Sequence, residues 1–340
     1  MEFGIFSNGS RPLRTEGEGW DEDLYEIELG DKLGFQEAWI SEHAVAGELL
    51  LCKAAARTKR IKLGPGVRSL PLYHPVHVAT EANACDHLTG GRYLMGIGVG
   101  FFPTRMRERG LDPALGHDMM RESLDCILEC WNSDKPFDWN GRFWQGKQIS
   151  VRPKPVQSPH PPIAVACTAS PETARMAGER NYALLFSSSD TAEHGREMAE
   201  HYVTAGGDAA SIRACRFVYV TDSVERAKRE LRPSMAIAIE QEKQRAPHRY
   251  AKRLPPSGRI EDVTFDFLVD AGHIIVGDPD TVYQRILDYY DRSGGFGVLM
   301  FHMGRDYGTR RGRARSMRLF TDQVAPRLGT LMPAGATARA

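Results

Sequence analysis

Residues 61–100, IKLGPGVRSLPLYHPVHVATEANACDHLTGGRYLMGIGVG, contain the pattern that decides the fold. The first ten and the last nine of these residues include runs of apolar and β-prone side chains, which are typical of buried strands. Between them, Val78, Ala82, Cys85 and Leu88 recur at the spacing of one helix face. A strand, a helix and a second strand in succession favour two parallel strands joined through a helix.

The same alternation continues along the chain. Strand-like runs occur at eight places, residues 3–6, 37–40, 61–70, 92–100, 162–167, 183–188, 215–221 and 297–303. Helical patterns lie near 20–33, 47–58, 75–88 and 117–131, from 171, near 191–205, from 223, and near 279–293 and 313–327. Eight such units predict an α/β fold of the closed (β/α)8 TIM barrel type, and an open, doubly wound sheet is the main alternative. We expect residues 1–330 to form this barrel as a single domain.

Two segments interrupt the alternation. Residues 132–161 are rich in Pro and Trp, and we expect an excursion here after the fourth strand. Residues 241–262 are polar and basic and contain prolines, which predicts a long exposed loop before the eighth strand. We expect residues 331–340 to form a disordered C-terminal tail.

The composition argues against several classes of protein and of binding partner for this chain. The 340 residues carry a formal net charge of zero and no half is strongly basic, so we expect neither nucleic acid nor an anionic membrane as the main partner. The N-terminal segment lacks the basic and apolar regions of a signal peptide, and no apolar run reaches the ~18 residues of a membrane-spanning helix. The scattered cysteines form no CxxC pair, which predicts reduced thiols, a cytoplasmic location and no metal site.

Polar side chains follow the second predicted strand. Ser41, Glu42 and His43 come directly after the apolar run at 37–40. In a barrel, catalytic groups lie at the carboxyl ends of the strands, an end that we call the mouth. Because imidazole titrates near neutral pH, His43 beside Glu42 is a candidate for giving or taking a proton. The alternative is that His43 caps the next helix.

Glycine-rich segments occur in the third and fourth predicted strands. The sequence GIGVG, residues 96–100, lacks the GxGxxG spacing of a dinucleotide-binding turn. We expect it instead to bring backbone close to a flat ligand. Gly64, Pro65 and Gly66 interrupt a regular strand, which indicates a bulge or another close approach to a ligand.

The sequence TASPETARMAGER, residues 168–180, predicts the N-terminus of a helix. Ser170 suits the N-cap, Pro171 the first helical position and Thr173 the third. The free N–H groups of such an end bind anions, and two hydroxyls would add hydrogen bonds to a phosphate. Glu172 favours the alternative of an ordinary capped helix, because its carboxylate would repel a phosphate. Both interpretations stay open on these residues alone.

Together these segments resemble the bacterial luciferase-like flavin-dependent monooxygenases. The resemblance covers nearly the whole chain and lies in the order and spacing of its motifs. They are ISEHA (40–44), LPLYHPVHVATEANACDHLTGGRYLMGIGVG (70–100), WNGRFWQGKQISVRPKPVQSPHPPIAVACTASPETARMAGER (139–180) and GDPDTVYQRILDYYDRSGGFGVLMFHM (277–303). The family has a (β/α)8 barrel, which agrees with the predicted fold.

The resemblance implies that reduced FMN binds at the mouth, with its phosphate on Ser170 and Thr173. It also implies a cis peptide bond between Gly66 and Val67, against the flavin ring. The cofactor residues that it implies are Gly66, Val67, Gly98, Gly100, Phe101, Ala169, Ser170 and Thr173. It places His43, with Glu42 next to it in the sequence, beside the reactive face of the ring as catalytic residues.

The activity that the resemblance implies is transfer of one oxygen atom from O2 to an organic molecule. Reduced FMN would come from a separate flavin reductase, and members of the family are commonly homodimers. Apolar and aromatic candidates at the mouth favour an apolar or aromatic small substrate, and the alternative for each is a place in the core; they are Phe6, Trp39, Phe101, Phe102 and Phe186. Two alternatives remain, a deazaflavin-dependent oxidoreductase on the same barrel and a flavin-binding homologue without catalysis.

One position departs from the luciferase pattern. Val99 stands where that pattern has an arginine that helps to hold the phosphate, and Arg105 and Arg107 are candidates to replace it. The segment after His43 is also shorter than in luciferase, so we expect a different substrate pocket. Neither light emission nor a long-chain aldehyde substrate is therefore inferred.

Overall fold

The computed structural model of the 340-residue chain describes residues 1–8, 11, 13–42, 47–100, 103–254, 257–304, 307–333 and 336, without the side chains of residues 245, 248 and 249. The candidate residues His43, Phe101 and Phe102 lie outside this part of the chain, as does most of the predicted tail at 331–340. Among the helices that are described, none has the length and hydropathy that crossing a membrane requires.

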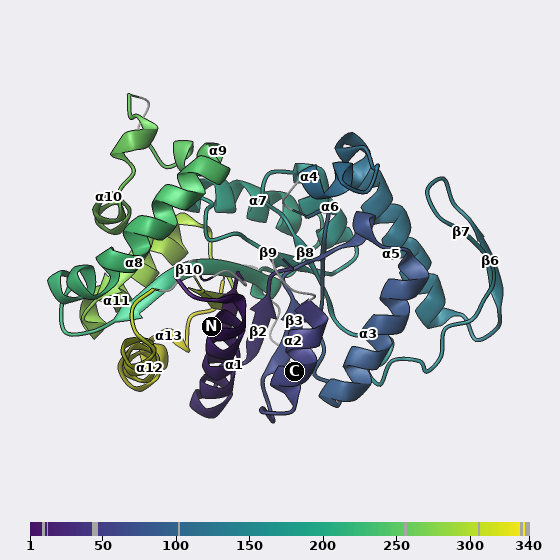
Figure 1. The fold of residues 1–340 in the computed structure, drawn as a ribbon, viewed down its shortest axis with the longest axis horizontal. Coiled ribbons are helices and arrows are strands. Elements are labelled where there is room, and N and C mark those ends of the chain that lie inside the picture. The colour runs from purple at the N-terminus through teal and green to yellow at the C-terminus, as the bar shows by residue number, and fades with distance from the viewer. Residues whose placement is uncertain are drawn as a thin grey trace.

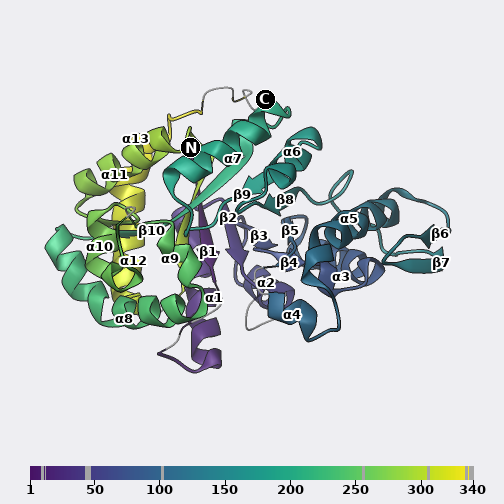
Figure 2. The ribbon, with the colours of Figure 1, turned by 90° about the horizontal axis from the view of Figure 1, so that it is seen from above.

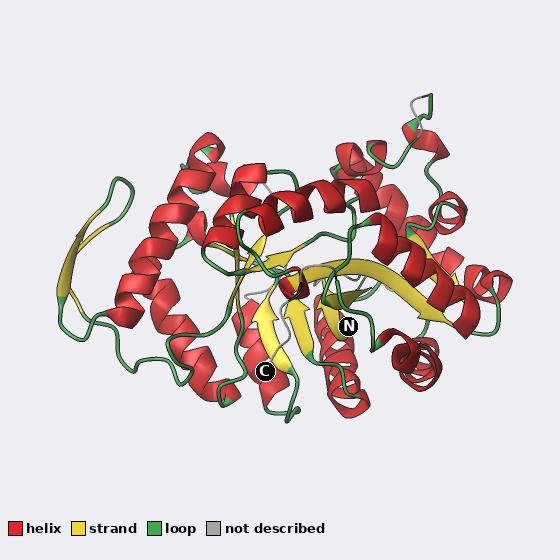
Figure 3. Ribbon diagram, turned by 180° about the vertical axis from the view of Figure 1, so that it is seen from behind, coloured by secondary structure: helices red, strands yellow, loops and turns green. Residues whose placement is uncertain are grey.

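A parallel sheet at the centre of the molecule curls into a barrel (Figure 3). Its order is β3 (Lys62–Pro65), β2 (Glu37–Ile40), β1 (Glu2–Ser7), β12 (Val298–Met303), β10 (Ile212–Val220), β9 (Ala183–Leu185), β8 (Ile163–Ala166), β5 (Met95–Gly98) and β4 (Arg68–Ser69). The third predicted strand is split into β3 and β4, and a parallel bridge between Leu63 and Tyr93 closes the circle. The predicted (β/α)8 barrel is therefore confirmed, and the open sheet is wrong.

Helices surround the barrel on its outside (Figures 1 and 2). They are α1 (Glu16–Leu33), α2 (Gly47–Ala55), α3 (Pro75–Thr89), α4 (Pro103–Arg107), α5 (Gly116–Asn132), α6 (Pro171–Glu179), α7 (Ala192–Thr204), α8 (Val224–Arg245), α10 (Phe265–Asp270), α11 (Pro279–Arg292), α12 (Arg310–Leu319) and α13 (Ala325–Leu328). Capping residues define several of their ends. Thr15 and Glu18 form a reciprocal capping box at the start of α1, and Gly34 ends that helix with φ 88°.

The interior of the barrel is filled by a compact apolar core. It consists of Trp39, Leu94, Ala164, Leu185, Cys215, Val298 and Met300, with Phe6 and Val67 packed against it. The indole of Trp39 fits because Gly64 and Gly96 have no side chains: a Cβ atom at either position would lie 2.8–2.9 Å from its ring carbons. A second, larger core lies between the strands and the helices. The glycines of the third and fourth strands thus make room for a large side chain.

The structure differs from the sequence-based prediction between β10 and β12. The long loop expected at 241–262 is partly helical, because α8 runs to Arg245 and α9 covers Pro247–Ala251. The residues QEKQR at 241–245 favour helix, and Pro247 suits the first position of α9. An additional strand, β11 (Ile274–Gly277), pairs in parallel with residues 217–220 of β10. The sequence-based prediction missed this strand, which pairs with the last four residues of β10.

The excursion predicted at 132–161 is confirmed. It contains an antiparallel hairpin of β6 (Phe137–Asn140) and β7 (Gln145–Ile149), which projects from the side of the molecule (Figure 1). The carboxylate of Glu122 on α5 accepts hydrogen bonds from three consecutive backbone N–H groups at the turn, residues 142–144, at 2.9–3.2 Å. The hairpin is therefore anchored to α5 rather than to the barrel.

Candidate active site

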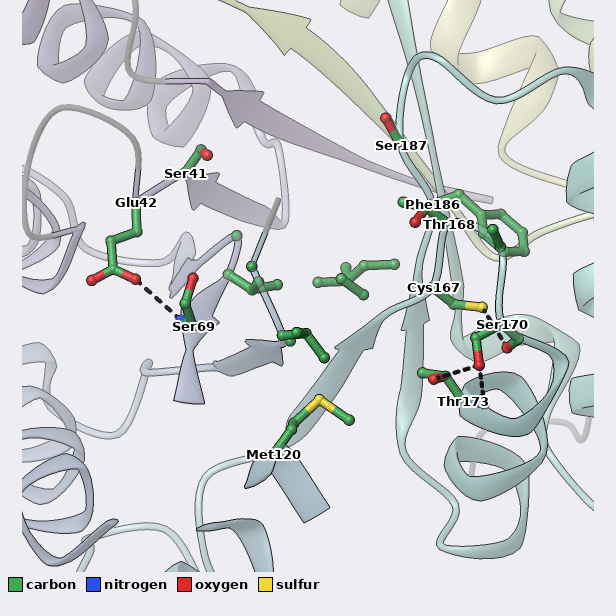
Figure 4. A pocket seen from close by; sticks show the side chains of 18 of the residues that line it. Ser41, Glu42, Ser69, Met120, Cys167, Thr168, Ser170, Thr173, Phe186 and Ser187 are labelled. Atoms are coloured by element: carbon green, nitrogen blue, oxygen red, sulfur yellow. Dashed lines mark hydrogen bonds between the residues drawn. The ribbon is translucent and has the colours of Figure 1, made fainter. Parts of the chain in front are cut away.

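A cavity of about 520 Å³ opens at the mouth of the barrel (Figure 4). Its walls come from the ends of β1, β2, β5, β8, β9 and β12, from the β3–β4 junction, and from α4, α5 and α6. The volume is within the range of cofactor and small-molecule sites in proteins. Every candidate cofactor residue that the structure describes lines it: Gly66, Val67, Gly98, Gly100, Ala169, Ser170 and Thr173.

One wall of the cavity consists mainly of backbone. The peptide bond between Gly66 and Val67 is cis, as predicted. A Cβ atom at Gly98 would lie 2.8 Å from Cγ2 of Val67. Gly100 has φ 93°, and a Cβ atom there would lie 2.6 Å from Oγ of Ser69. Neighbouring side chains and the backbone conformation therefore require glycine at positions 98 and 100, and both residues line the cavity with Gly66 and Val67.

Glu42 lies at the cavity but is held in a buried network of hydrogen bonds. Its Oε2 accepts from the backbone N–H of Ser69 at 3.1 Å, and its Oε1 accepts from the hydroxyl of Tyr73 and from Nη1 of Arg68 at 3.5 Å. Burial and the bond to Glu42 raise the pKa of Tyr73 to about 12. The side chain of Glu42 therefore joins the end of β2 to β4 and the segment that follows it.

Arg68 is the centre of this network. Its Nη1 also donates to Glu48 of α2 at 3.1 Å, and its Nη2 donates to Glu81 of α3. The guanidinium group stacks over the ring of Tyr73, 3.7 Å from the centroid. Because the three carboxylates come from separate segments, no local sequence pattern predicts the cluster. Only the presence of a charged residue within an otherwise apolar strand signals it.

The N-terminus of α6 stabilises negative charge. The Oγ atom of Ser170 accepts from the backbone N–H of Thr173 at 3.2 Å and from its hydroxyl at 3.1 Å (Figure 4). The hydroxyl of Ser170 in turn donates to a carboxylate oxygen of Glu172 at 3.2 Å. Hydrogen bonds from the backbone and from Ser170 lower the pKa of the Glu172 carboxyl. An anionic group of the chain thus already binds at this helix end.

The opposite side of the cavity presents side chains. His302 of β12 is 4% exposed, stacks on Phe217 at 4.1 Å between centroids, and contacts Phe6 edge-on at 5.5 Å. Its Nδ1 shares a hydrogen bond with the hydroxyl of Ser188, which follows β9. The wall around this pair includes Phe186 and Met300. Sequence reasoning missed His302 and Ser188, which are 114 residues apart.

Arg253 fixes the loop that carries Ser188. Its Nη2 donates to the carbonyl oxygen of Ser188 at 2.8 Å, and its Nε donates to that of Ser189 at 3.2 Å. Burial lowers the pKa of Arg253 to about 10. The segment predicted to be a free loop at 241–262 therefore contributes a buried contact to the rim of the cavity.

Of the other candidate residues, some line the cavity and others lie elsewhere. Arg105 lines the cavity, and its Nη1 donates to the carbonyl oxygen of Glu42 at 2.6 Å. Arg107 is exposed and does not line it. Trp39 is 1% exposed within the barrel core, which decides between the two places that the sequence left open for it. Its indole packs inside the barrel because Gly64 and Gly96 leave room for it.

Comparison with known proteins agrees with this architecture. The family model described as luciferase-like monooxygenase matches residues 1–295. The chain is 33% identical to 4-hydroxyprotoasukamycin monooxygenase of Streptomyces nodosus subsp. asukaensis, over 96% of this chain and 92% of that protein. It is 30% identical to limonene 1,2-monooxygenase of Rhodococcus erythropolis, over 90% and 80%.

A solved structure extends the comparison to three dimensions. The oxygenating constituent of 3,6-diketocamphane monooxygenase from Pseudomonas putida, in complex with FMN, superposes with a TM-score of 0.84. The two chains are 28% identical, and the match covers 98% of this chain and 99% of that one. The family predicted from the sequence motifs is confirmed: the chain belongs to the luciferase-like monooxygenases.

Proposed function

We propose that this monooxygenase uses reduced FMN and O2 to insert one oxygen atom into an apolar or aromatic small molecule. One observation carries the proposal: a single cavity is lined both by the glycine-rich ends of β3 and β5 and by a helix end that stabilises an anion. A flavin mononucleotide has one flat ring system and one phosphate. The FMN complex of the 3,6-diketocamphane relative supports the same assignment.

The residues of the cavity fit this cofactor. Gly66, Val67, Gly98 and Gly100 would lie against the ring, and Ala169, Ser170 and Thr173 would hold the phosphate. Phe101, which is outside the described residues, keeps its proposed place at the edge of the ring from the resemblance alone. When bound, reduced FMN supplies the electrons that activate O2. The protein supplies orientation and exclusion of water around it.

We propose separate roles for the two polar residues after β2. His43 would give or take the proton that oxygen transfer requires, a role that rests on the sequence motif. Glu42 would act through others, because both of its carboxylate oxygens accept hydrogen bonds from Ser69, Tyr73 and Arg68. It is a positioning residue in this account, which fixes the end of the strand from which His43 continues.

The organic substrate would occupy the side of the cavity formed by β1, β9 and β12. Phe6, Phe186 and Met300 provide apolar surface there, and Ser188 with His302 provides the polar contact. Two of the relatives are named for limonene and for a diketocamphane, which supports a compact, mostly hydrocarbon substrate.

Reduced FMN would come from a separate flavin reductase. The solved relative is named as the oxygenating constituent of its enzyme, which supports a division into components. We also propose a homodimer, from the family resemblance, and a cytoplasmic location, from the scattered cysteines. Analytical ultracentrifugation would test the first.

The test of the proposed function separates it from two alternatives. The protein is mixed with a flavin reductase, NADH, FMN and a panel of cyclic ketones, terpenes and phenols, and products are analysed by mass spectrometry. A product with one added oxygen atom supports a monooxygenase. Turnover only with reduced deazaflavin and without O2 would show the deazaflavin-dependent oxidoreductase. Tight flavin binding without any product across the panel would favour a non-catalytic homologue.

A further inference from the structure

A positively charged side chain would strengthen the binding of a phosphate at the N-terminus of α6, and the described part of the cavity offers few. Among the described residues that line it, the side chains that can be cationic are Arg105, His117 and His302. Arg105 donates to the carbonyl oxygen of Glu42, at the end of β2. His302 bonds to Ser188 on the β9 side. His117, in the first turn of α5, is the one that remains for the α6 side.

The start of α5 packs directly on Val99. A Cβ atom at Gly116 would lie 2.5 Å from Cγ1 of Val99 and 3.4 Å from the sulfur of Met106. His117 is the next residue, so it stands beside a part of the wall that is otherwise apolar. An imidazole here supplies the polar group that Val99 cannot.

An ion pair sets the register between α5 and α6. Nη1 of Arg180, which ends α6, lies 2.7 Å from Oδ1 of Asp125 on α5. Asp125 comes eight residues after His117, and Arg180 comes eight residues after Glu172. Both helices follow parallel strands of the barrel and run in the same direction, so His117 lies level with Glu172. Glu172 is the residue whose carboxylate bonds to Ser170 at the helix end.

We infer that His117 is the cation that binds the phosphate of the flavin cofactor, together with Ser170 and Thr173. This inference rests on the proposed function and adds a residue to it. In the imidazolium form the ring offers two N–H donors and a positive charge to a phosphate monoester. The phosphate would lie between the ring of His117 and the N-terminus of α6, away from the apolar residues beside the ring.

The charges around His117 make this contact dependent on pH. Burial and Arg121 lower the pKa of His117, while Asp118 on the same helix and Glu172 on α6 act in the opposite direction. Asp118 itself pairs with Arg121 at 3.3 Å and with Arg142 of the hairpin at 3.8 Å. In the free protein the ring is therefore mostly neutral at pH 8. A bound phosphate stabilises the imidazolium form and raises its pKa, so binding takes up a proton.

The contribution of His117 to FMN affinity decreases as the pH rises. Below the pKa of the free protein, His117 is charged with or without FMN, and its contribution to affinity is complete. As the pH rises through the pKa of the complex, that contribution is lost. The phosphate of FMN has its own second ionisation near pH ~6, which changes affinity in the opposite direction. This second effect is the same in every variant, so a comparison of variants removes it.

Equilibrium titration of flavin fluorescence tests the inference. FMN and riboflavin are titrated at pH 5.5, 6.5 and 8 into wild type, His117→Gln, His117→Arg and the control His87→Gln, whose side chain is on the exposed face of α3. We expect His117→Gln to bind FMN roughly 10-fold more weakly than wild type at pH 5.5 and only about 2-fold more weakly at pH 8. His117→Arg should keep tight binding at pH 8, where wild type weakens. Riboflavin binding should be the same in all four proteins.

Three other outcomes would contradict the role of His117 or the proposed function. Equal FMN affinity of wild type and His117→Gln at pH 5.5, with FMN still preferred to riboflavin, would overturn the role of His117 and leave the proposed function intact. The same loss at every pH would show a neutral, structural role instead. Wild-type protein that binds neither flavin would overturn the proposed function and this inference together.

Discussion

The two sides of the cavity mouth differ in what they present. On the side of β3, β5 and β8 the surface is mainly backbone, with the cis bond at Gly66–Val67, the glycines that end β5 and the helix end at Ser170. On the side of β9 and β12 the surface is made of side chains, with Ser188 and His302 among apolar residues. Backbone recognises shape and charge that are common to one cofactor. Side chains can differ between related enzymes and set the choice of substrate.

This division implies that substitutions on the two sides change different quantities. On the backbone side they should change flavin affinity, and on the side-chain side they should change the substrate parameters at constant flavin affinity. His43 should change neither kind of binding and only the chemical step.

The largest effect is expected for His43→Ala. A general acid or base contributes ~10²–10⁴-fold, so product formation should fall by that factor while hydrogen peroxide rises. FMN affinity and melting temperature should stay at the wild-type values, and His87→Ala serves as the control. Product at the wild-type rate would assign His43 to helix capping, and loss of folding would assign it a structural role.

The next largest effect should come from the double variant Ser170→Ala/Thr173→Ala. Each lost hydrogen bond to a charged group costs ~1.5–3 kcal/mol, so FMN affinity should fall by roughly 100-fold or more while riboflavin affinity is unchanged. The loss of the cap also lowers stability by ~1 kcal/mol. Thr191→Ala removes the corresponding cap of α7 and is the matched control. A parallel loss of riboflavin binding would mean that the phosphate lies elsewhere.

A smaller effect, on the other side of the mouth, is expected for Ser188→Ala. Removal of one neutral hydrogen bond of ~0.5–1.5 kcal/mol should raise the KM of a substrate that carries a carbonyl or hydroxyl group by about 2- to 10-fold. FMN affinity should not change. Ser189→Ala, which alters the same loop outside the cavity lining, is the control. If Ser188→Ala weakens FMN instead, the division of the mouth is wrong.

The smallest effect is expected for Glu172→Gln. The carboxylate competes with a phosphate for the end of α6, so its removal should raise FMN affinity by about 2- to 5-fold. Glu179→Gln, at the other end of the same helix, should have no effect on affinity. Tightening of riboflavin binding by the same factor would contradict the competition.

The same division explains how much of the molecule could be predicted from its sequence. The N-cap at Ser170 and the glycines of β5 depend on local geometry, so their residue types signal their places. The barrel itself follows from the strand and helix periods. The pair of His302 and Ser188, and the carboxylates around Arg68, join segments that are distant in the sequence. No local sequence pattern predicts these contacts between distant segments.

The misassigned segments have a similar cause. Local composition at 241–262, with its prolines and charges, indicated a loop, but Pro247 begins a short helix and Arg253 reaches the rim of the cavity. The short run at Ile274–Gly277 becomes a strand only because residues 217–220 of β10 extend far enough to pair with it. The contact of Arg253 and the pairing of β11 both join segments that are distant in the sequence, whereas the helices at 241–251 follow local propensity.

Isotope transfer from dioxygen distinguishes a monooxygenase from an oxidoreductase that does not use O2. The protein, a flavin reductase and FMN are supplied with a converted substrate under isotopically heavy O2, and the product is analysed by mass spectrometry. The account predicts that each product molecule carries one heavy oxygen atom, with the other released in water. A product whose new oxygen comes from water, or a product formed equally well without O2, would contradict it.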